Sequence, residues 1–334
     1  SFIGSSFFVG EKVEHASKML SLNKTYKLEE LERWMDTKEV VSTFKIDGSS
    51  CSLIYNSGKL TLAKTRGDGR FGEKITNKVL YIDHVPKSLE GYNKNFEIRG
   101  EIFCREKDFI HLSQEMEKLN LEKPTSQRNI VAGLLGRKEN IELARFLSFQ
   151  AFEFISNEES LHTEEDKFRH LRKLGFETPE YNKSKSRKEI QAQVEEAREF
   201  MSQGDYLIDG LVVSFNNLDL HDRLGETAHH PRYKIAFKFE GEMKPTIIKS
   251  ISWQVSRNGI LTPVANVESV ELSGANVSRV TLHNFGLVKQ FNLKTGDKIN
   301  IIRSGEVIPK FIDVVKSSDE SFKYPVECPS CDQE

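Results

Sequence analysis

The residues with the clearest chemical potential stand in the stretch Lys45-Ile46-Asp47-Gly48. A lysine amine becomes a nucleophile once it loses its proton, and desolvation or neighbouring cations favour the neutral form. An Asp-Gly pair after an apolar run is equally typical of a plain β-turn, with the lysine in solvent. This motif alone therefore leaves both interpretations open.

Four further segments contain charged residues of the kinds that a lysine nucleophile and a phosphate substrate need nearby. They are Thr65-Arg66-Gly67-Asp68-Gly69, Arg99-Gly100-Glu101, Asp209-Gly210 and Lys238. An arginine suits a phosphate or a ribose hydroxyl, and a strand can present a carboxylate on one face. Each segment taken singly is more often structural, but their combination in this order is much more specific.

The elements that must position these residues divide the chain into an α+β region and an all-β region. Helices are predicted over 27–36, 105–120, 163–174 and 186–203, with three turn-separated strands over 40–69 and further strands at 96–104, 147–155, 207–216 and 233–242. This alternation predicts antiparallel sheets flanked by helices. From about residue 246 we expect five or so short strands and no helix, as in an OB-fold barrel, after a linker at 243–246.

Composition narrows the class of protein. With 334 residues, 37% of them hydrophobic, the chain can form two domains with ordinary cores. A net charge of -2 excludes histone-like binding by bulk charge but leaves room for a local basic groove. Apolar runs are strand-sized, so no membrane span or signal peptide is predicted. Four cysteines, with Cys51 and Cys104 expected to be buried, favour a reducing, cytoplasmic setting.

Ten blocks of the sequence resemble, in order, those of the NAD⁺-dependent DNA ligases, within the covalent nucleotidyltransferases. The blocks are HASKMLSLNKTY (15–26), KIDG (45–48), TRGDGRFGEKITNKV (65–79), RGEIF (99–103), QRNIVAG (127–133), DGLVV (209–213), RLGETAHHPRYKIAFKF (223–239), VSRNGILTPVA (255–265), VTLHN (280–284) and RSGEVIP (303–309). The resemblance implies an ATP-grasp-like adenylation (nucleotidyltransferase) domain over 1–243, an OB-fold over 246–318 and a tail over 319–334.

The resemblance also implies a three-step reaction that serves DNA replication and repair. Lys45 would attack the α-phosphorus of NAD⁺, release nicotinamide mononucleotide and carry AMP. The AMP would pass to the 5′-phosphate of a DNA nick, and the 3′-hydroxyl would displace it to seal the strand. Asp47 would order the nucleophile and the 3′-hydroxyl, and Asp209 would orient the nucleophile or the waters of the metal.

Ligand contacts are implied in the same way. The nucleotide would contact Leu20, Ser21, Leu22, Lys45, Arg66, Glu101, Arg128, Phe152 and Lys238. Mg²⁺ would bind through phosphates and waters near Glu101 and Asp209. Nicked duplex DNA would contact Arg128, Arg137, Arg257, Arg279, His283 and Arg303.

The sequence departs from the family pattern at three places. Thr43 stands where the family has a glutamate that contacts the adenine amino group. Gly136 replaces an arginine, which Arg137 can supply after a one-residue insertion. Ser214 replaces a lysine near the phosphates, and the sequence leaves open whether Lys234 compensates. These departures motivate an alternative, a degenerate ligase relative that holds nicked DNA without reacting.

Several family modules are not expected within this chain. The helical module that grips nicotinamide mononucleotide would precede residue 1, and zinc-finger, helix-hairpin-helix and BRCT parts would follow, either in a longer chain or on a second subunit. Cys328 and Cys331 resemble half of a four-cysteine zinc knuckle, which needs two more ligands. An RNA ligase or capping-type enzyme is a weaker alternative, because VTLHN and RSGEVIP resemble nick-related blocks.

Overall fold

The computed structural model describes residues 10–124, 126–239, 241–255, 260–272, 275–304, 309–327 and 329. The chain forms two compact units. The first comprises residues up to 109, 127–197 and 205–238, and the second comprises 110–126, 198–204 and the residues from 239 onward.

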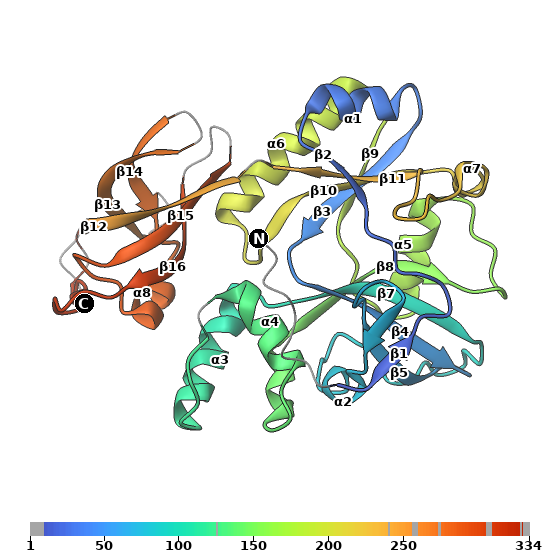
Figure 1. Ribbon diagram of the computed structural model, residues 1–334, viewed down its shortest axis with the longest axis horizontal. Coiled ribbons are helices and arrows are strands. Elements are labelled where there is room, and N and C mark those ends of the chain that lie inside the picture. Colours follow the sequence, from blue (N-terminus) through green and yellow to red (C-terminus); the bar gives the residue numbers. More distant parts are fainter. Residues whose placement is uncertain are drawn as a thin grey trace. The chain divides into compact units, whose positions relative to one another are not determined.

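Two main sheets and a small two-stranded one build the first unit (Figure 1). The five-stranded sheet has the order β2 (Asn23–Thr25), β11 (Lys234–Lys238), β10 (Ile208–Phe215), β3 (Val40–Ile46), β9 (Tyr181–Ser184). The four-stranded sheet has the order β5 (Lys59–Thr65), β4 (Ser49–Asn56), β7 (Phe96–Phe103), β8 (Ser148–Ile155), and β1 (Lys12–Glu14) pairs with β6 (Phe71–Glu73). The predicted antiparallel pairing is confirmed except between β2 and β11, which run parallel.

Gly48 lets the chain cross from one main sheet to the other. β3 ends at Ile46 in the five-stranded sheet, and β4 begins at Ser49 in the four-stranded sheet. A Cβ atom on Gly48 would lie 2.2 Å from the backbone oxygen of Ile102, a distance that no side chain tolerates. The Asp-Gly turn therefore does more than reverse the chain: it places Lys45 where the two sheets meet.

Helices accompany the sheets, four of them at predicted places. Before residue 239 the structure describes α1 (Leu28–Met35), α2 (Thr76–Val79), α3 (Glu106–Lys118), α4 (Gln127–Leu135), the 3₁₀ helix η1 (Ile141–Phe146), α5 (Glu164–Lys173), α6 (Arg187–Gln203) and α7 (Leu218–Leu224). Thr163 and Asp166 form a reciprocal capping box at the start of α5. α2, α4, η1 and α7 were not predicted, although the buried residues Ile130 and Leu134 of α4 are spaced by one helical turn.

A closed barrel forms the core of the second unit, as predicted for an OB-fold. Its strands follow the order β12 (Gly241–Val255), β13 (Leu261–Leu272), β14 (Ala275–Thr281), β16 (Lys310–Lys316), β15 (Lys298–Ser304). The side chains of Val280, Leu282, Ile299 and Ile301 are fully buried inside it. These positions alternate along their strands, which is why one face of each strand fills the barrel.

Two local expectations for the second unit were wrong. The expected absence of a helix is overturned by α8 (Phe285–Phe291), which begins where the Asn284 side chain accepts a hydrogen bond from the Leu287 N–H. The stretch 243–246 is not a linker but part of β12, where Pro245 lies opposite Asn300. Residues 241–247 of β12 pair only with β15, so the missing proline N–H falls on the unpaired side.

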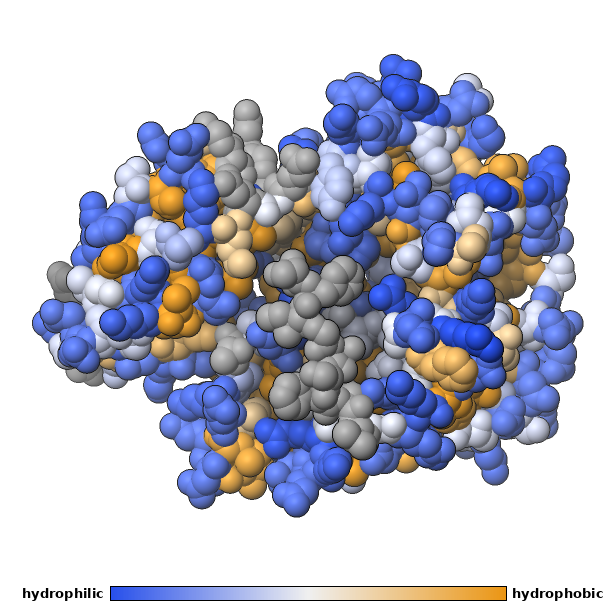
Figure 2. Space-filling model, viewed as in Figure 1, coloured by the Kyte–Doolittle hydropathy of each residue, from blue (hydrophilic) through white to orange (hydrophobic). Residues whose placement is uncertain are grey.

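Hydrophilic residues cover most of the surface visible in Figure 2, and apolar residues form small scattered groups. Within the described residues, no helix is both long enough and apolar enough to cross a membrane.

Candidate functional site

A cavity of about 730 Å³ lies in the first unit, lined by residues from both main sheets. Its walls include eight of the predicted nucleotide-binding residues: Leu20, Ser21, Leu22, Lys45, Arg66, Glu101, Phe152 and Lys238. The ninth, Arg128, is not among them. The volume falls in the range typical of small-molecule sites.

Strand register explains which side chains face this cavity. Three cross-strand rows on β3, β10 and β11 supply one wall: Lys45–Gly210–Lys238, Thr43–Val212–Ala236 and Val41–Ser214–Lys234. Because side chains alternate along a strand, residues two apart share a face. The cavity wall therefore has one end with Lys45 and Lys238 and an opposite end with Ser214 and Lys234.

Asp209 bridges the two lysines of the first row. Its Oδ1 lies 3.2 Å from Lys45 Nζ, and its Oδ2 lies 2.9 Å from Lys238 Nζ. A β-bulge between Ile208 and Gly210 leaves Asp209 as the extra residue of β10, and bulges commonly redirect a side chain in this way. Two cations held by one carboxylate provide an anion-binding position beside a potential nucleophile.

Glu101 lies near this group, and its pKa is raised above the ordinary value. Burial raises its pKa to about 7, although the Ser50 hydroxyl, which donates to Oε2 at 2.5 Å, and the nearby Lys45 both act to lower it. The carboxyl therefore exchanges a proton close to neutral pH. Its predicted place beside the cavity agrees with the cavity lining.

Asp47 and Arg128 form an ion pair. Arg128 Nε donates to Asp47 Oδ2 at 2.7 Å, and a second guanidinium nitrogen contacts the same oxygen. The Arg128 side chain, which extends from α4, is 63% exposed, so the pair is open to a competing anion.

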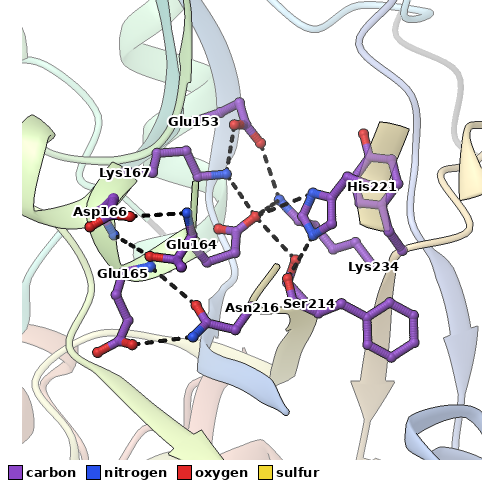
Figure 3. Close-up of polar contacts among 12 residues, drawn as sticks. Glu153, Glu164, Glu165, Asp166, Lys167, Ser214, Asn216, His221 and Lys234 are labelled. Atoms are coloured by element: carbon purple, nitrogen blue, oxygen red, sulfur yellow. Dashed lines mark hydrogen bonds and ion pairs between the residues drawn. The ribbon is translucent and has the colours of Figure 1, made fainter. Parts of the chain in front are cut away.

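The far end of the cavity holds a cluster of ionised side chains that the sequence did not predict (Figure 3). Lys167 Nζ lies 2.7 Å from Glu153 and 2.8 Å from Glu164, and Lys234 Nζ lies 3.1 Å from Glu153. Burial opposes charge on both acids, but Lys167 and Lys234 outweigh it and lower the pKa of each. The sequence predicts the helix that carries Glu164 and Lys167 but not their burial, which the fold imposes.

Ser214 belongs to this cluster and not to the row that holds Lys45 and Lys238. Its hydroxyl donates to Glu164 Oε1 at 3.1 Å, and Lys234 lies directly opposite it on β11. Position 214 therefore does not adjoin Lys45 and Lys238, because three residues of β10 lie between Gly210 and Ser214. Burial lowers the pKa of the neighbouring His221, whose Nε2 lies 2.6 Å from the Phe215 carbonyl oxygen, so this imidazole is neutral.

A second bulge sets Phe152 and Glu153 on the same cavity. Arg99 pairs with Glu153 and Gly100 pairs with Ala151, which leaves Phe152 as the extra residue of β8. In a regular strand these two neighbours would point to opposite faces. Both instead line the cavity, an aromatic ring beside a carboxylate.

None of the described residues that were predicted to contact DNA lines this cavity. Arg279 is exposed on β14, and Arg303 donates to the Leu272 carbonyl oxygen at 3.2 Å. Burial and the nearby Lys310 lower the pKa of His283 to about 3, so its ring carries no charge at neutral pH. Arg137 lies just beyond the end of α4. Arg257, Cys328 and Cys331 fall outside the described residues.

Among the described residues, metal-ligating side chains occur singly or in pairs. The described residues contain no group of three or more His, Cys, Asp or Glu side chains that could hold an ion. Glu101 and Asp209 nevertheless flank Lys45, and Mg²⁺ commonly binds one or two carboxylates while substrate phosphates and waters complete its shell. The donors present fit that mode. Cys51 and Cys104 are buried, as predicted, and burial raises the pKa of both thiols.

Comparison with known proteins gives consistent matches. Residues 8–242 match the NAD-dependent DNA ligase adenylation domain, and residues 245–323 match the NAD-dependent DNA ligase OB-fold domain. The chain is 36% identical to a DNA ligase of Acetivibrio thermocellus over 96% of its own length and 51% of that protein. It is 38% identical to a DNA ligase of Endomicrobium trichonymphae over 99% of its length and 51% of that protein.

The chain thus spans about half the length of the curated relatives it matches. Among solved structures, Chlorella virus DNA ligase-adenylate aligns with 89% of this chain and 100% of its own, at 14% identity and a TM-score of 0.45, a likeness too distant to carry an argument.

Proposed function

Because the chain belongs to the NAD-dependent DNA ligase family, we propose that it seals nicks in duplex DNA with NAD⁺ as the source of AMP. The observation that carries this proposal is the position of Lys45, which stands with Lys238 and Asp209 at one end of a nucleotide-sized cavity. The domain bounds 1–243, 246–318 and 319–334 belong to the same proposal.

In the first step the neutral Lys45 amine attacks the α-phosphorus of NAD⁺. A P–N bond forms, the bond from that phosphorus to the bridging oxygen breaks, and nicotinamide mononucleotide leaves with the electron pair. The amine must lose a proton, and Asp209 Oδ1 lies 3.2 Å away. Lys238 neutralises charge on the phosphorus as it becomes five-coordinate. Mg²⁺ supplies further neutralisation when bound, with Glu101 and Asp209 as its flanking carboxylates.

In the second and third steps AMP moves to DNA and is displaced. An oxygen of the 5′-phosphate attacks the adenylate, the P–N bond breaks and the amine of Lys45 recovers a proton. The 3′-hydroxyl then attacks the activated 5′-phosphorus, a phosphodiester forms and AMP leaves. Asp47 orders the 3′-hydroxyl, and Arg128 exchanges its ion pair with Asp47 for a phosphate. Arg137, Arg257, Arg279, His283 and Arg303 contact the nicked duplex.

The nicotinamide half of NAD⁺ requires contacts of its own. We assign these, with the zinc-finger and helix-hairpin-helix parts, to a longer form of the chain or to a second subunit. Zn²⁺ would bind Cys328 and Cys331 only with two further ligands. The two buried thiols suit a reducing, cytoplasmic compartment.

Labelling with NAD⁺ that carries a radioactive adenylate tests the first step, in the presence of Mg²⁺ and with the family's nicotinamide-binding module added in trans. We expect acid-labile label on the wild type and none on Lys45→Met. Lys18→Met removes another lysine from the same cavity wall and should retain the label. A wild-type protein that takes no label under these conditions contradicts the proposal.

A nick that is already adenylated at its 5′-phosphate tests sealing without the NAD⁺ step. Joining of the two strands supports the enzyme, whereas stable binding without joining favours the degenerate, binding-only alternative.

A further inference from the structure

The far end of the cavity lies where the base of a bound nucleotide must be. Lys45 and Lys238 form one row of the wall, and Ser214 and Lys234 lie in a row four residues further along the strands. Four residues of a strand span about 13 Å. Lysine side chains reach inward from both rows, so a nucleotide whose α-phosphorus meets Lys45 presents the edge of its base to the second row.

Of the four charged side chains Glu153, Glu164, Lys167 and Lys234 at that end, two are open to the cavity. The side chains of Glu153 and Lys234 are 25% and 12% exposed, whereas those of Glu164 and Lys167 are 2% and 3% exposed. The Ser214 hydroxyl is already donated to Glu164. Thr43 contributes a small neutral side chain that is mostly buried.

The buried side chains of Glu164 and Lys167 hold Glu153 and Lys234 in place. Lys167 contacts one oxygen of Glu153, and Lys234 contacts the other. A carboxylate oxygen accepts more than one hydrogen bond, so Glu153 retains acceptor capacity toward the cavity. Lys234 likewise has three donor hydrogens, of which one points to Glu153 and one lies near Glu164 at 3.8 Å. The cavity therefore meets an acceptor and a donor side by side, both held in place.

This pairing is complementary to the edge of one purine. Adenine presents an amino group at C6, which donates, next to N1, which accepts. Hypoxanthine presents the reverse: a carbonyl oxygen at C6 and an N–H at N1. We propose that Glu153 accepts from the C6 amino group and Lys234 donates to N1, and that this ion pair selects adenine in a chain with Thr43 where the family has a glutamate. The inference rests on the proposed function for the identity of the nucleotide.

Phe152 strengthens the assignment. The bulge in β8 turns both Phe152 and Glu153 toward the cavity, so one strand offers a ring for the face of the base and a carboxylate for its edge. Glu226 is another carboxylate of the cavity wall, but it is exposed and accepts from the Tyr233 hydroxyl. Water competes for hydrogen bonds with an exposed carboxylate, so Glu226 should not select the base and serves as the matched control.

Calorimetric titration of the full chain with AMP and with IMP measures the selection without requiring any reaction. We expect AMP to bind about tenfold to a hundredfold more tightly than IMP, the range for a hydrogen bond to a charged group. Glu153→Gln should bring the ratio close to one, because the amide can also donate to the carbonyl of IMP. Glu226→Gln should leave the wild-type ratio unchanged.

Glu153→Asp guards against a folding defect. It retains the charge next to Lys167 but withdraws the carboxylate by one methylene, so it should fold and still lose most of the preference. Lys234→Met should weaken AMP binding more than IMP binding. A wild-type ratio near one, absence of AMP binding, or a wild-type ratio in both folded Glu153 variants would each overturn the proposal.

Labelling of Lys45 from NAD⁺ separates this inference from the proposed function. If AMP binds more tightly than IMP but Lys45 takes no label, the proposed base contacts are supported and the proposed reaction is contradicted. If Lys45 is labelled but AMP and IMP bind equally, the proposed reaction is supported and the proposed base contacts are contradicted.

Discussion

Asp209 holds the ammonium group of Lys45 at 3.2 Å while its other oxygen holds Lys238 at 2.9 Å. The Lys45–Asp209 contact lacks hydrogen-bond geometry, since Oδ1 has no hydrogen-bond partner, so it is an ion pair that can rearrange. The proposed nucleophile, the carboxylate proposed to orient it and the cation proposed to bind the phosphate thus form one unit.

Replacing Asp209 by Asn should slow the labelling of Lys45 by about a hundredfold, a typical loss for a group that handles a proton. The amide keeps the shape of the side chain but neither attracts the two lysines nor accepts a proton. Single-turnover labelling measures the rate. Asp205→Asn, which changes a 54% exposed partner of Arg105, serves as the control and should label normally. A normal rate in the Asp209 variant would show that the carboxylate is dispensable.

Glu101 should make the stability of the protein fall as the pH rises toward neutrality. Its pKa is about 7 in the folded protein, against 4.5 as the ordinary value. The folded state keeps the proton longer, so the stabilisation is fully present below pH 4.5 and is lost as the pH rises through 7. At about 1.36 kcal/mol per pKa unit, the loss approaches about 3 kcal/mol.

Urea unfolding at several pH values checks this dependence. Glu101→Gln carries no titratable group there and should give a flatter profile than the wild type between pH 5 and 8. Glu226→Gln should follow the wild type. Parallel profiles for the wild type and Glu101→Gln would contradict the expectation.

Gly48→Ala should destabilise the protein by about 2 kcal/mol or more, because the new methyl group would meet the Ile102 carbonyl oxygen at 2.2 Å. The crossover between the sheets must shift, and Lys45 shifts with it. Gly133→Ala offers the opposite case, since nothing lies within 4 Å of the added Cβ. In the helical interior of α4 that change should stabilise by up to about 1 kcal/mol. Equal unfolding free energies for the two variants would refute the steric explanation.

Lys167→Met should cost about 3–5 kcal/mol of unfolding free energy, because it leaves the buried carboxylates of Glu153 and Glu164 short of a counterion. The Lys167 side chain is only 3% exposed. Lys183, whose side chain is 48% exposed, pairs with Glu165 at 3.1 Å and gives the matched control. Lys183→Met should cost less than about 1 kcal/mol. Denaturant titration of both variants decides whether burial sets the difference.

Much of the cavity end that holds Lys45 follows from the sequence. Lys45, Glu101 and Lys238 each lie in a short block, and the strand periodicity around them predicts sheets with alternating faces. Nucleophilic chemistry requires particular residue types, so a short block of sequence is enough to indicate it. The helices α1, α3, α5 and α6 were predictable for a similar reason, because helical spacing of apolar residues is a local property.

Other features depend on pairing between distant segments. The bulges at Asp209 and Phe152 are defined only by the partner strands, and each redirects a side chain that the alternation rule would place otherwise. The strand around Pro245 is likewise possible only because one side of β12 stays unpaired there.

The sequence by itself indicated the residues at one end of the cavity: Lys45 as the proposed nucleophile, Lys238 as the proposed phosphate-binding cation and the order of the strands that carry them. Only the tertiary structure decided the chemistry at the other end. Register sets Lys234 opposite Ser214, and packing of α5 buries Lys167 between Glu153 and Glu164. A local stretch of sequence gives no sign that an ionised side chain is buried. Its partners come from distant segments, and its burial is a property of the whole fold.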